Sequence, residues 1–117
     1  MSDQSLKRLL TLVGLAQKAG KAASGETGCE EAVRSRKAAL VLLSQDASGG
    51  TQKKFRQSCF YYQIPVVTVP CTTEQLGHAL GRESRSCAAI LDEGLAAGIK
   101  NIQESIFLET RDRKVDQ

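Results

Sequence analysis

Apolar residues recur along the chain in two alternating patterns, one typical of helices and the other of buried strands. Apolar positions three or four residues apart predict helices over residues 2–19, 26–36, 51–63, 73–80 and 93–108. Short continuous apolar runs predict strands over residues 39–43, 64–69 and 86–91, and the pattern allows another short strand at residues 22–24. This order predicts an α/β fold, a three-layer α/β/α sandwich with a small mixed, mostly parallel sheet.

Polar residues and glycines mark several of the predicted helix ends. Thr72 and Gln75 have the spacing of a capping box, and Asp92 stands where it can cap the last helix. Gly20 and Gly81 each follow a predicted helix, where the left-handed backbone that glycine tolerates commonly ends one.

The length and composition are those of one small globular domain. The 117 residues are 41% hydrophobic and 25% charged. We expect a single domain over residues 1–108 and a frayed, charged tail over residues 109–117. No apolar run reaches the ~18 residues of a membrane span, and the N-terminus has no signal-peptide pattern. The sequence therefore predicts a cytoplasmic protein without a membrane partner.

The net charge of +3 is unevenly distributed along the chain. Residues 1–60 contain ten Lys or Arg against five Asp or Glu, whereas residues 61–117 contain six against eight. A basic N-terminal half can attract a polyanion such as RNA. A lysine-rich solvated surface without a partner is the equally simple alternative.

Residues that could support catalysis or bind a metal are few and scattered. The four cysteines, at positions 29, 59, 71 and 87, lack CxxC spacing, so we expect reduced, buried thiols and no zinc ribbon. His78, the only histidine, falls on the outer side of its predicted helix. Asp92 and Glu93 lie at a helix start, where capping explains them. The sequence contains no phosphate-binding glycine loop or zinc-protease motif, so we expect no enzymatic activity, metal or cofactor.

The segment Gly25-Glu26-Thr27-Gly28 is the most informative local feature. It places two glycines at a predicted helix start, where free backbone N–H groups and the positive end of the helix dipole favour anions. A glycine helix cap without further function is the alternative. The basic residues within ten positions of this segment are Lys18, Lys21, Arg34, Arg36 and Lys37.

A second polar loop, residues 81–86, joins the fourth helix to the last strand. Its two arginines, Arg82 and Arg85, can form forked hydrogen bonds with phosphates or base edges. In the predicted sandwich this loop could lie near the start of the second helix, and a plain connecting loop is the alternative. Tyr61 and Tyr62 are not predicted to form a stacking platform, because one of them faces the core.

Six blocks of sequence follow a family pattern in order. The blocks are Leu15–Lys21, Ser24–Glu26, Lys37–Ala47, Tyr61–Val66, Leu76–Gly81 and Ala89–Gly94. With them the chain resembles the kink-turn RNA-binding ribosomal proteins of the L-seven-Ae and L-thirty-e superfamily, and in particular its bacterial YlxQ-like branch. The resemblance covers about residues 5–105.

The resemblance implies an α/β/α sandwich that binds structured RNA, either a kinked helix with sheared G·A pairs or ribosomal RNA. It also implies that the start of the second helix enters the groove at those pairs, while the loop over residues 81–86 covers an extruded nucleotide. The candidate RNA-binding residues are Lys21, Gly25, Glu26, Thr27, Gly28, Glu31, Arg34, Lys37, Arg82, Ser84 and Arg85.

The chain departs from the family pattern in both segments. The second loop is usually apolar in the family, whereas here it contains Arg82, Ser84 and Arg85. Family members that bind kink-turns tightly usually have Asn-Glu after the glycine and a lysine three residues further on, whereas this chain has Thr27, Gly28 and Glu31. Base-specific readout and phosphate-dominated recognition therefore remain two alternatives. We expect a monomeric, non-enzymatic RNA-binding protein. The alternative is a protein-interaction module on the same fold whose basic half docks an acidic protein.

Overall fold

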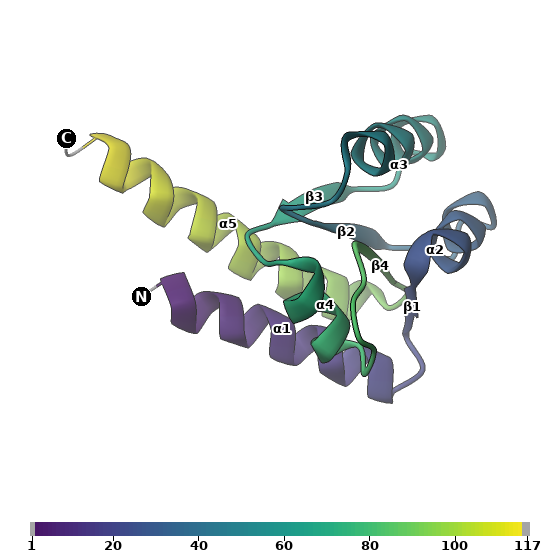
Figure 1. Cartoon of the computed structure of the whole chain (residues 1–117), viewed down its shortest axis with the longest axis horizontal. Coiled ribbons are helices and arrows are strands. Elements are labelled where there is room, and N and C mark those ends of the chain that lie inside the picture. The colour runs from purple at the N-terminus through teal and green to yellow at the C-terminus, as the bar shows by residue number, and fades with distance from the viewer. Residues whose placement is uncertain (1, 116–117) are drawn as a thin grey trace.

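The computed structural model describes the backbone of residues 2–115 and the side chains of residues 4–108. Figure 1 shows its elements in chain order: α1 (Ser2–Lys18), β1 (Ala22–Ser24), α2 (Gly25–Arg34), β2 (Leu40–Ser44), α3 (Gly49–Tyr62), β3 (Val66–Val69), α4 (Thr73–Ala79), β4 (Cys87–Ile90) and α5 (Glu93–Val115). The helices and strands predicted from the sequence are all present, including the short strand at residues 22–24. Their ends agree to within two residues except at the end of α5.

The four strands form one mixed sheet in the order β1-β4-β2-β3. Only β2 and β3 pair in parallel, whereas β4 runs antiparallel to both β1 and β2. The mixed sheet is confirmed, but the prediction that it is mostly parallel is wrong. A parallel neighbour requires a crossover that carries the chain back to the end of the sheet where the preceding strand began. The seven-residue α4 makes no such crossover. β4 begins at Cys87, opposite Leu43, at the same end of the sheet where β3 finishes, and therefore runs in the opposite direction.

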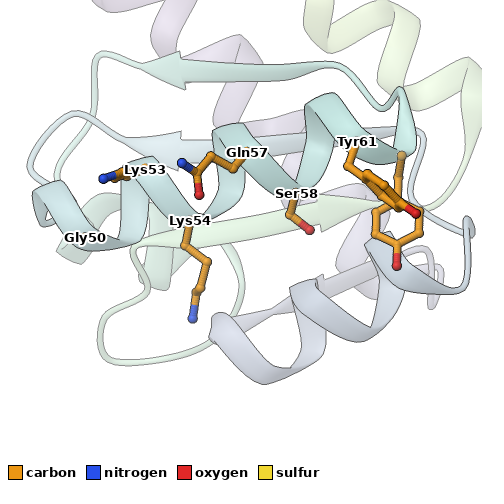
Figure 2. A pocket seen from close by; sticks show the side chains of 7 residues that line it. Gly50, Lys53, Lys54, Gln57, Ser58 and Tyr61 are labelled. Carbon is orange, nitrogen blue, oxygen red and sulfur yellow. The ribbon is translucent and has the colours of Figure 1, made fainter.

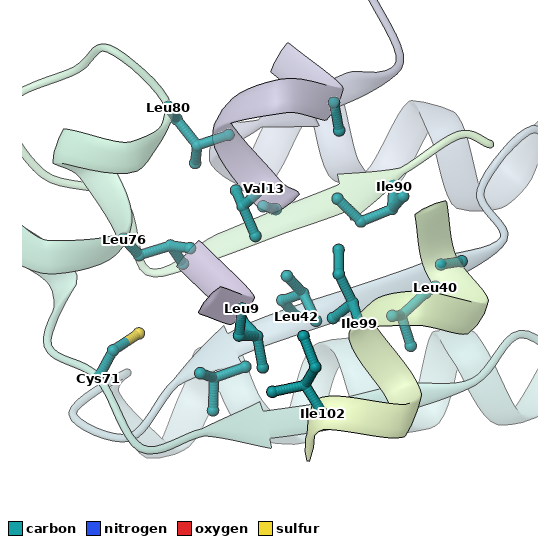
Figure 3. Packing of buried hydrophobic residues seen from close by; sticks show 14 of the residues in the cluster. Leu9, Val13, Leu40, Leu42, Cys71, Leu76, Leu80, Ile90, Ile99 and Ile102 are labelled. Carbon is teal, nitrogen blue, oxygen red and sulfur yellow. The ribbon is translucent and has the colours of Figure 1, made fainter. Parts of the chain in front are cut away.

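Helices cover both faces of the sheet, which confirms the three-layer sandwich. In Figure 1, α1, α4 and α5 lie on one face and α2 and α3 on the other. Successive residues of a strand point to opposite faces. Accordingly, Leu40 and Leu42 of β2 pack toward α1 and α5 (Figure 3), whereas Val41 and Leu43 pack toward α2 and α3. Because β2 is buried on both faces, it has the continuous apolar run by which it was predicted.

The predicted helix ends are largely confirmed. Thr72 and Gln75 form both hydrogen bonds of a capping box, and the Asp92 carboxylate accepts a hydrogen bond from the Leu95 N–H at 2.8 Å. Gly20 and Gly81 have φ angles of 72° and 71°, in the left-handed region.

The prediction that the last helix ends at residue 108 is wrong, because α5 continues through Val115. The charged composition of this segment suggested fraying, but Glu, Arg and Lys are good helix formers. The final residues of the predicted tail, 116–117, lie outside the described part of the chain.

The cysteines and His78 lie as the sequence predicts. All four cysteines are free and buried, and His78 is exposed. Within the described residues there is no group of three His, Cys, Asp or Glu side chains placed to hold a metal ion. In the same part of the chain no helix has the length and apolar character needed to cross a bilayer.

Candidate nucleic-acid interface

The start of α2 and the loop over residues 81–86 lie side by side, as the sequence analysis anticipated. They form an open hollow of about 420 Å³ whose lining consists of Gly25, Glu26, Thr27, Thr73, Ser84, Arg85 and Ser86. The Arg85 side chain crosses directly over Gly25, because a methyl group on that glycine would lie 3.7 Å from Arg85 Nε. Below, this site is called the α2 hollow.

Strand pairing brings these two distant segments together. β1 leads into α2 and pairs antiparallel with β4, with Ser24 opposite Ala88. The chain that enters α2 therefore lies beside the chain that enters β4. A further bond anchors the loop to α4, since the Arg85 N–H donates to the Thr73 carbonyl at 3.0 Å. The Thr73 N–H in turn donates to the Asp46 carboxylate at 3.0 Å, which fixes the start of α4 to the end of β2.

The first turn of α2 offers hydrogen-bond donors and positive dipole charge to an anion. Gly25 has a φ angle of 82°, so the chain enters the helix through a conformation that glycine adopts without strain. The N-cap residue Ser24 makes no side-chain hydrogen bond to this turn within the described structure. The backbone N–H groups at a helix start have no partner inside the helix and lie at the positive end of its dipole. An anion at this point would meet both.

Glu26 lies in the same turn, and it shares the ammonium group of Lys54 on α3 with Glu30. The Lys54 ammonium lies 2.5 Å from the Glu26 carboxylate and 2.9 Å from that of Glu30. The hydrogen bond from Lys54 and its positive charge lower the pKa of Glu26. The hydrogen bonds that Lys54 donates to both carboxylates raise the pKa of Lys54. Glu26 and Lys54 are therefore ionised near neutral pH, and their contact ties α3 to the start of α2.

The Arg85 guanidinium makes one hydrogen bond to the backbone and keeps another donor without a partner among the described residues. One guanidinium nitrogen, Nη1, donates to the Ser84 carbonyl at 2.7 Å. Its Nε is buried and has no hydrogen-bond partner in the part of the chain that is described. A guanidinium that is anchored on one side and unsatisfied on another suits a phosphate or carboxylate ligand.

The other arginine of the loop points elsewhere. Arg82 lines a separate hollow of about 550 Å³, together with His78, Glu74 and Glu83. The two carboxylates there oppose the binding of an anion. The structure therefore separates Arg82 from Arg85, which the sequence analysis had grouped.

The remaining predicted residues are dispersed. Arg34 and Lys37 lie at the far end of α2, about 15 Å along a ten-residue helix from Gly25. Lys21 precedes β1, whose extended residues separate it from α2 by roughly 10 Å. Gly28 is half-buried and lies near Ala23, while Glu31 is exposed on the next turn. Of the eleven candidates, the α2 hollow brings together Gly25, Glu26, Thr27, Ser84 and Arg85.

Sequence reasoning missed the part that α3 plays at this site. Lys54 reaches Glu26, and the Thr51 hydroxyl also approaches that carboxylate, at 3.4 Å. The signal was present, because α3 has three basic residues and no acidic one. The packing of α3 beside α2 could not be read from the sequence.

The fold and this geometry define a small α/β sandwich that displays a helix start beside an arginine-bearing loop. The chain belongs to the Ribosomal protein L7Ae/L30e/S12e/Gadd45 family, whose model matches residues 7–100. The resemblance inferred from the six sequence blocks is therefore confirmed.

Two relatives are bacterial proteins of the same name. The chain is 41% identical over 85 residues to the RNA-binding protein YlxQ of Bacillus subtilis (strain 168), an alignment that covers 73% of this chain and 84% of the relative. It is 31% identical over 104 residues to the RNA-binding protein YlxQ of Enterococcus faecium, covering 89% and 99% of the two chains. These matches agree with the bacterial branch that the sequence suggested.

Solved structures share the fold. A protein of unknown function from Bacillus halodurans C superimposes with a TM-score of 0.77 and 34% identity, covering 82% of this chain and 96% of that one. The Giardia lamblia 15.5kD RNA binding protein gives a TM-score of 0.73 at 20% identity, covering 90% and 89%. At that identity the second likeness concerns the fold alone.

Proposed function

We propose that this protein binds structured RNA without catalysing a reaction, through the α2 hollow. The observation that supports this most directly is the placement of the Arg85 guanidinium over Gly25, beside a helix start without a side-chain cap. An RNA phosphate is the ligand whose charge and geometry suit both groups. Membership of the L7Ae family and the names of the two bacterial relatives favour the same ligand.

The preferred RNA in this proposal is a kink-turn or a similarly bent segment of ribosomal RNA. In this proposal the widened groove of such a bend admits the start of α2, and the loop over residues 81–86 covers an extruded nucleotide. Thr27 is exposed at the rim of the α2 hollow, where its hydroxyl can reach a base edge or a phosphate. Because Thr27, Gly28 and Glu31 depart from the family pattern, we propose that phosphates supply most of the affinity.

A titration with two matched RNAs tests this proposal. A labelled kink-turn RNA is compared with the same RNA whose G·A pairs are replaced by Watson–Crick pairs, each at two salt concentrations. We expect the intact kink-turn to bind more tightly and both affinities to fall as salt rises. Equal affinities with a steep salt dependence would reject the kink-turn preference and leave a phosphate-binding surface.

The same titration separates RNA binding from docking of an acidic protein. A folded protein that binds neither RNA even at low salt would reject the proposal and favour the protein-interaction alternative. Binding of this kind needs no cofactor, and we extend the proposal to a cytoplasmic monomer. Light scattering of the free protein would test the oligomeric state.

A further inference from the structure

The outer face of α3 forms a second basic surface, which the proposed function does not use. It is an open hollow of about 510 Å³ on α3, and its lining consists of Gly50, Lys53, Lys54, Gln57, Ser58, Tyr61 and Tyr62 (Figure 2). Below, this surface is called the α3 face. Because α3 has no acidic residue, its own charges are all positive. Lys53 is exposed and forms no ion pair with any described residue, so its charge is available to a ligand.

An aromatic pair stands at the far end of this face. Tyr61 is 74% exposed, which is unusual for so large a ring, and Tyr62 beside it is half-buried. The two rings meet edge to face, with centroids 4.8 Å apart and planes at 81°. Tyr62 is held in turn by Arg36, whose guanidinium lies 5.3 Å from the Tyr62 ring centroid and donates to the Tyr62 carbonyl at 3.2 Å. Tyr61 is therefore supported from one side, and most of its ring is open to solvent.

The α3 face is continuous with the α2 hollow. Lys54 links the two, because it lines the α3 face and its ammonium contacts Glu26, which lines the hollow. From Lys54 to Tyr61 the helix rises by about 10 Å. A stacked strand advances roughly 3.4 Å per nucleotide, so this length fits about three nucleotides. In Figure 2 the lysines lie toward one end of α3 and Tyr61 lies at the other.

We infer that the α3 face binds a short single-stranded extension of the structured RNA. In this arrangement Lys53 contacts a phosphate, Gln57 and Ser58 offer hydrogen bonds, and a base stacks on Tyr61, while Lys54 stays paired with Glu26 and Glu30. A positively charged surface combined with an exposed aromatic ring is a usual means by which proteins bind single strands without reading sequence. An acidic peptide would use Lys53 but would leave the ring of Tyr61 without a role. This inference rests on the proposed RNA binding at the α2 hollow.

The test compares one structured RNA with and without a four-nucleotide uridine extension, placed in turn at each end. We expect the extension at one end to tighten binding by the wild-type protein. Tyr61→Ala should weaken binding to that extended RNA at least about fivefold and leave the unextended RNA unaffected. Tyr61→Phe keeps the ring and should bind like the wild type. Phe107→Ala removes another exposed ring, on α5, and serves as the matched control.

The outcomes separate this inference from the proposed function. If the unextended RNA binds but neither extension adds affinity, or if Tyr61→Ala weakens both RNAs equally, the inference is wrong and RNA binding at the α2 hollow stands. If neither RNA binds, both proposals fail.

A fluorescence measurement distinguishes a stacked base from an acidic peptide. The chain contains no tryptophan, so Tyr61→Trp introduces a single reporter on the α3 face. We expect the extended RNA to quench its emission and the unextended RNA to leave it nearly unchanged. Equal quenching by a poly-glutamate peptide at the same concentration would overturn the assignment to RNA.

Discussion

Gly77 of α4 lies directly against the backbone of Ser84, so that a methyl group added to Gly77 would stand 2.5 Å from Ser84 Cα. This contact lets the loop over residues 81–86 fold back along α4. The Arg82 N–H, which donates to the Gly77 carbonyl at 2.7 Å, secures the loop in that position. The placement of Arg85 over the start of α2 therefore depends on the absence of a side chain at Gly77.

We expect Gly77→Ala to destabilise the fold, because backbone atoms cannot move aside as the end of a side chain can. Overpacking of this kind typically lowers the free energy of unfolding by about 1–3 kcal/mol. Urea denaturation measures the change. Gly49→Ala is the matched control, since a methyl group there meets no atom of the described structure and should leave stability nearly unchanged. Equal stability of the two variants would show that the contact with Ser84 relaxes freely.

Gly77→Ala should also weaken RNA binding beyond its effect on stability, since Arg85 would be displaced from the α2 hollow. The measurement is an RNA titration at a temperature where the variant remains folded. Unchanged affinity in a destabilised protein would mean that the position of the loop is not needed for binding.

The link between Lys54 and Glu26 predicts a shifted titration. Lys54→Gln removes the hydrogen bond and the charge that lower the pKa of Glu26, so this pKa should rise toward the ordinary value of 4.5. NMR titration of the side-chain carboxyl carbon of Glu26 in both proteins measures the shift. Lys53→Gln, which removes a charge from the neighbouring position, is the control and should change this pKa little. An unchanged pKa in Lys54→Gln would contradict the ion pair.

The same ion pair predicts that the protein loses stability as the pH falls. The folded state lowers the pKa of Glu26. The ionised Glu26 therefore stabilises the fold at pH values above its unfolded-state pKa, and this stabilisation is lost as pH falls through its folded-state pKa. The effect should be small, because both side chains are more than a third exposed and water screens the pair. Denaturation of wild type and Lys54→Gln at pH 7 and pH 3 should therefore show a slightly larger difference at pH 7.

The cysteines should resist labelling in the native protein. Burial raises the pKa of Cys59 to about 11, and burial with the nearby charge of Asp46 raises that of Cys71 to about 11. A thiol that is both buried and protonated reacts slowly with a disulfide reagent. At pH 8 we expect little reaction until denaturant is added and all four thiols become accessible. Rapid labelling of the folded protein would show that one of these sites opens readily.

The sequence predicted the layers of this fold better than it predicted the candidate site. The continuous apolar run of residues 39–43 identified β2 correctly because burial on both faces favours apolar residues at successive positions of a strand. The direction of β4 was missed because an apolar run does not show at which end of the sheet the next strand begins after a short helix such as α4. The contact of Lys54 with Glu26 was missed for a related reason: it depends on how α3 packs against α2.

The separation of Arg82 from Arg85 yields a sharper prediction than their shared loop did. Arg85 lines the α2 hollow, whereas Arg82 lies among the carboxylates of Glu74 and Glu83. We expect Arg85→Ala to weaken RNA binding clearly and Arg82→Ala to have a much smaller effect. The double variant should resemble Arg85→Ala, and unfolding curves should confirm that all three proteins remain folded.

The dependence of binding on salt tests the role of Arg85 independently of the size of the loss. If Arg85 contacts one phosphate, Arg85→Ala should reduce the slope of log affinity against log salt concentration by about 1. Arg82→Ala should leave the slope unchanged. A large loss of affinity with an unchanged slope would place Arg85 on a base edge instead, because such a contact releases no counterion. Equal effects of the two substitutions would contradict the division of the loop into two surfaces.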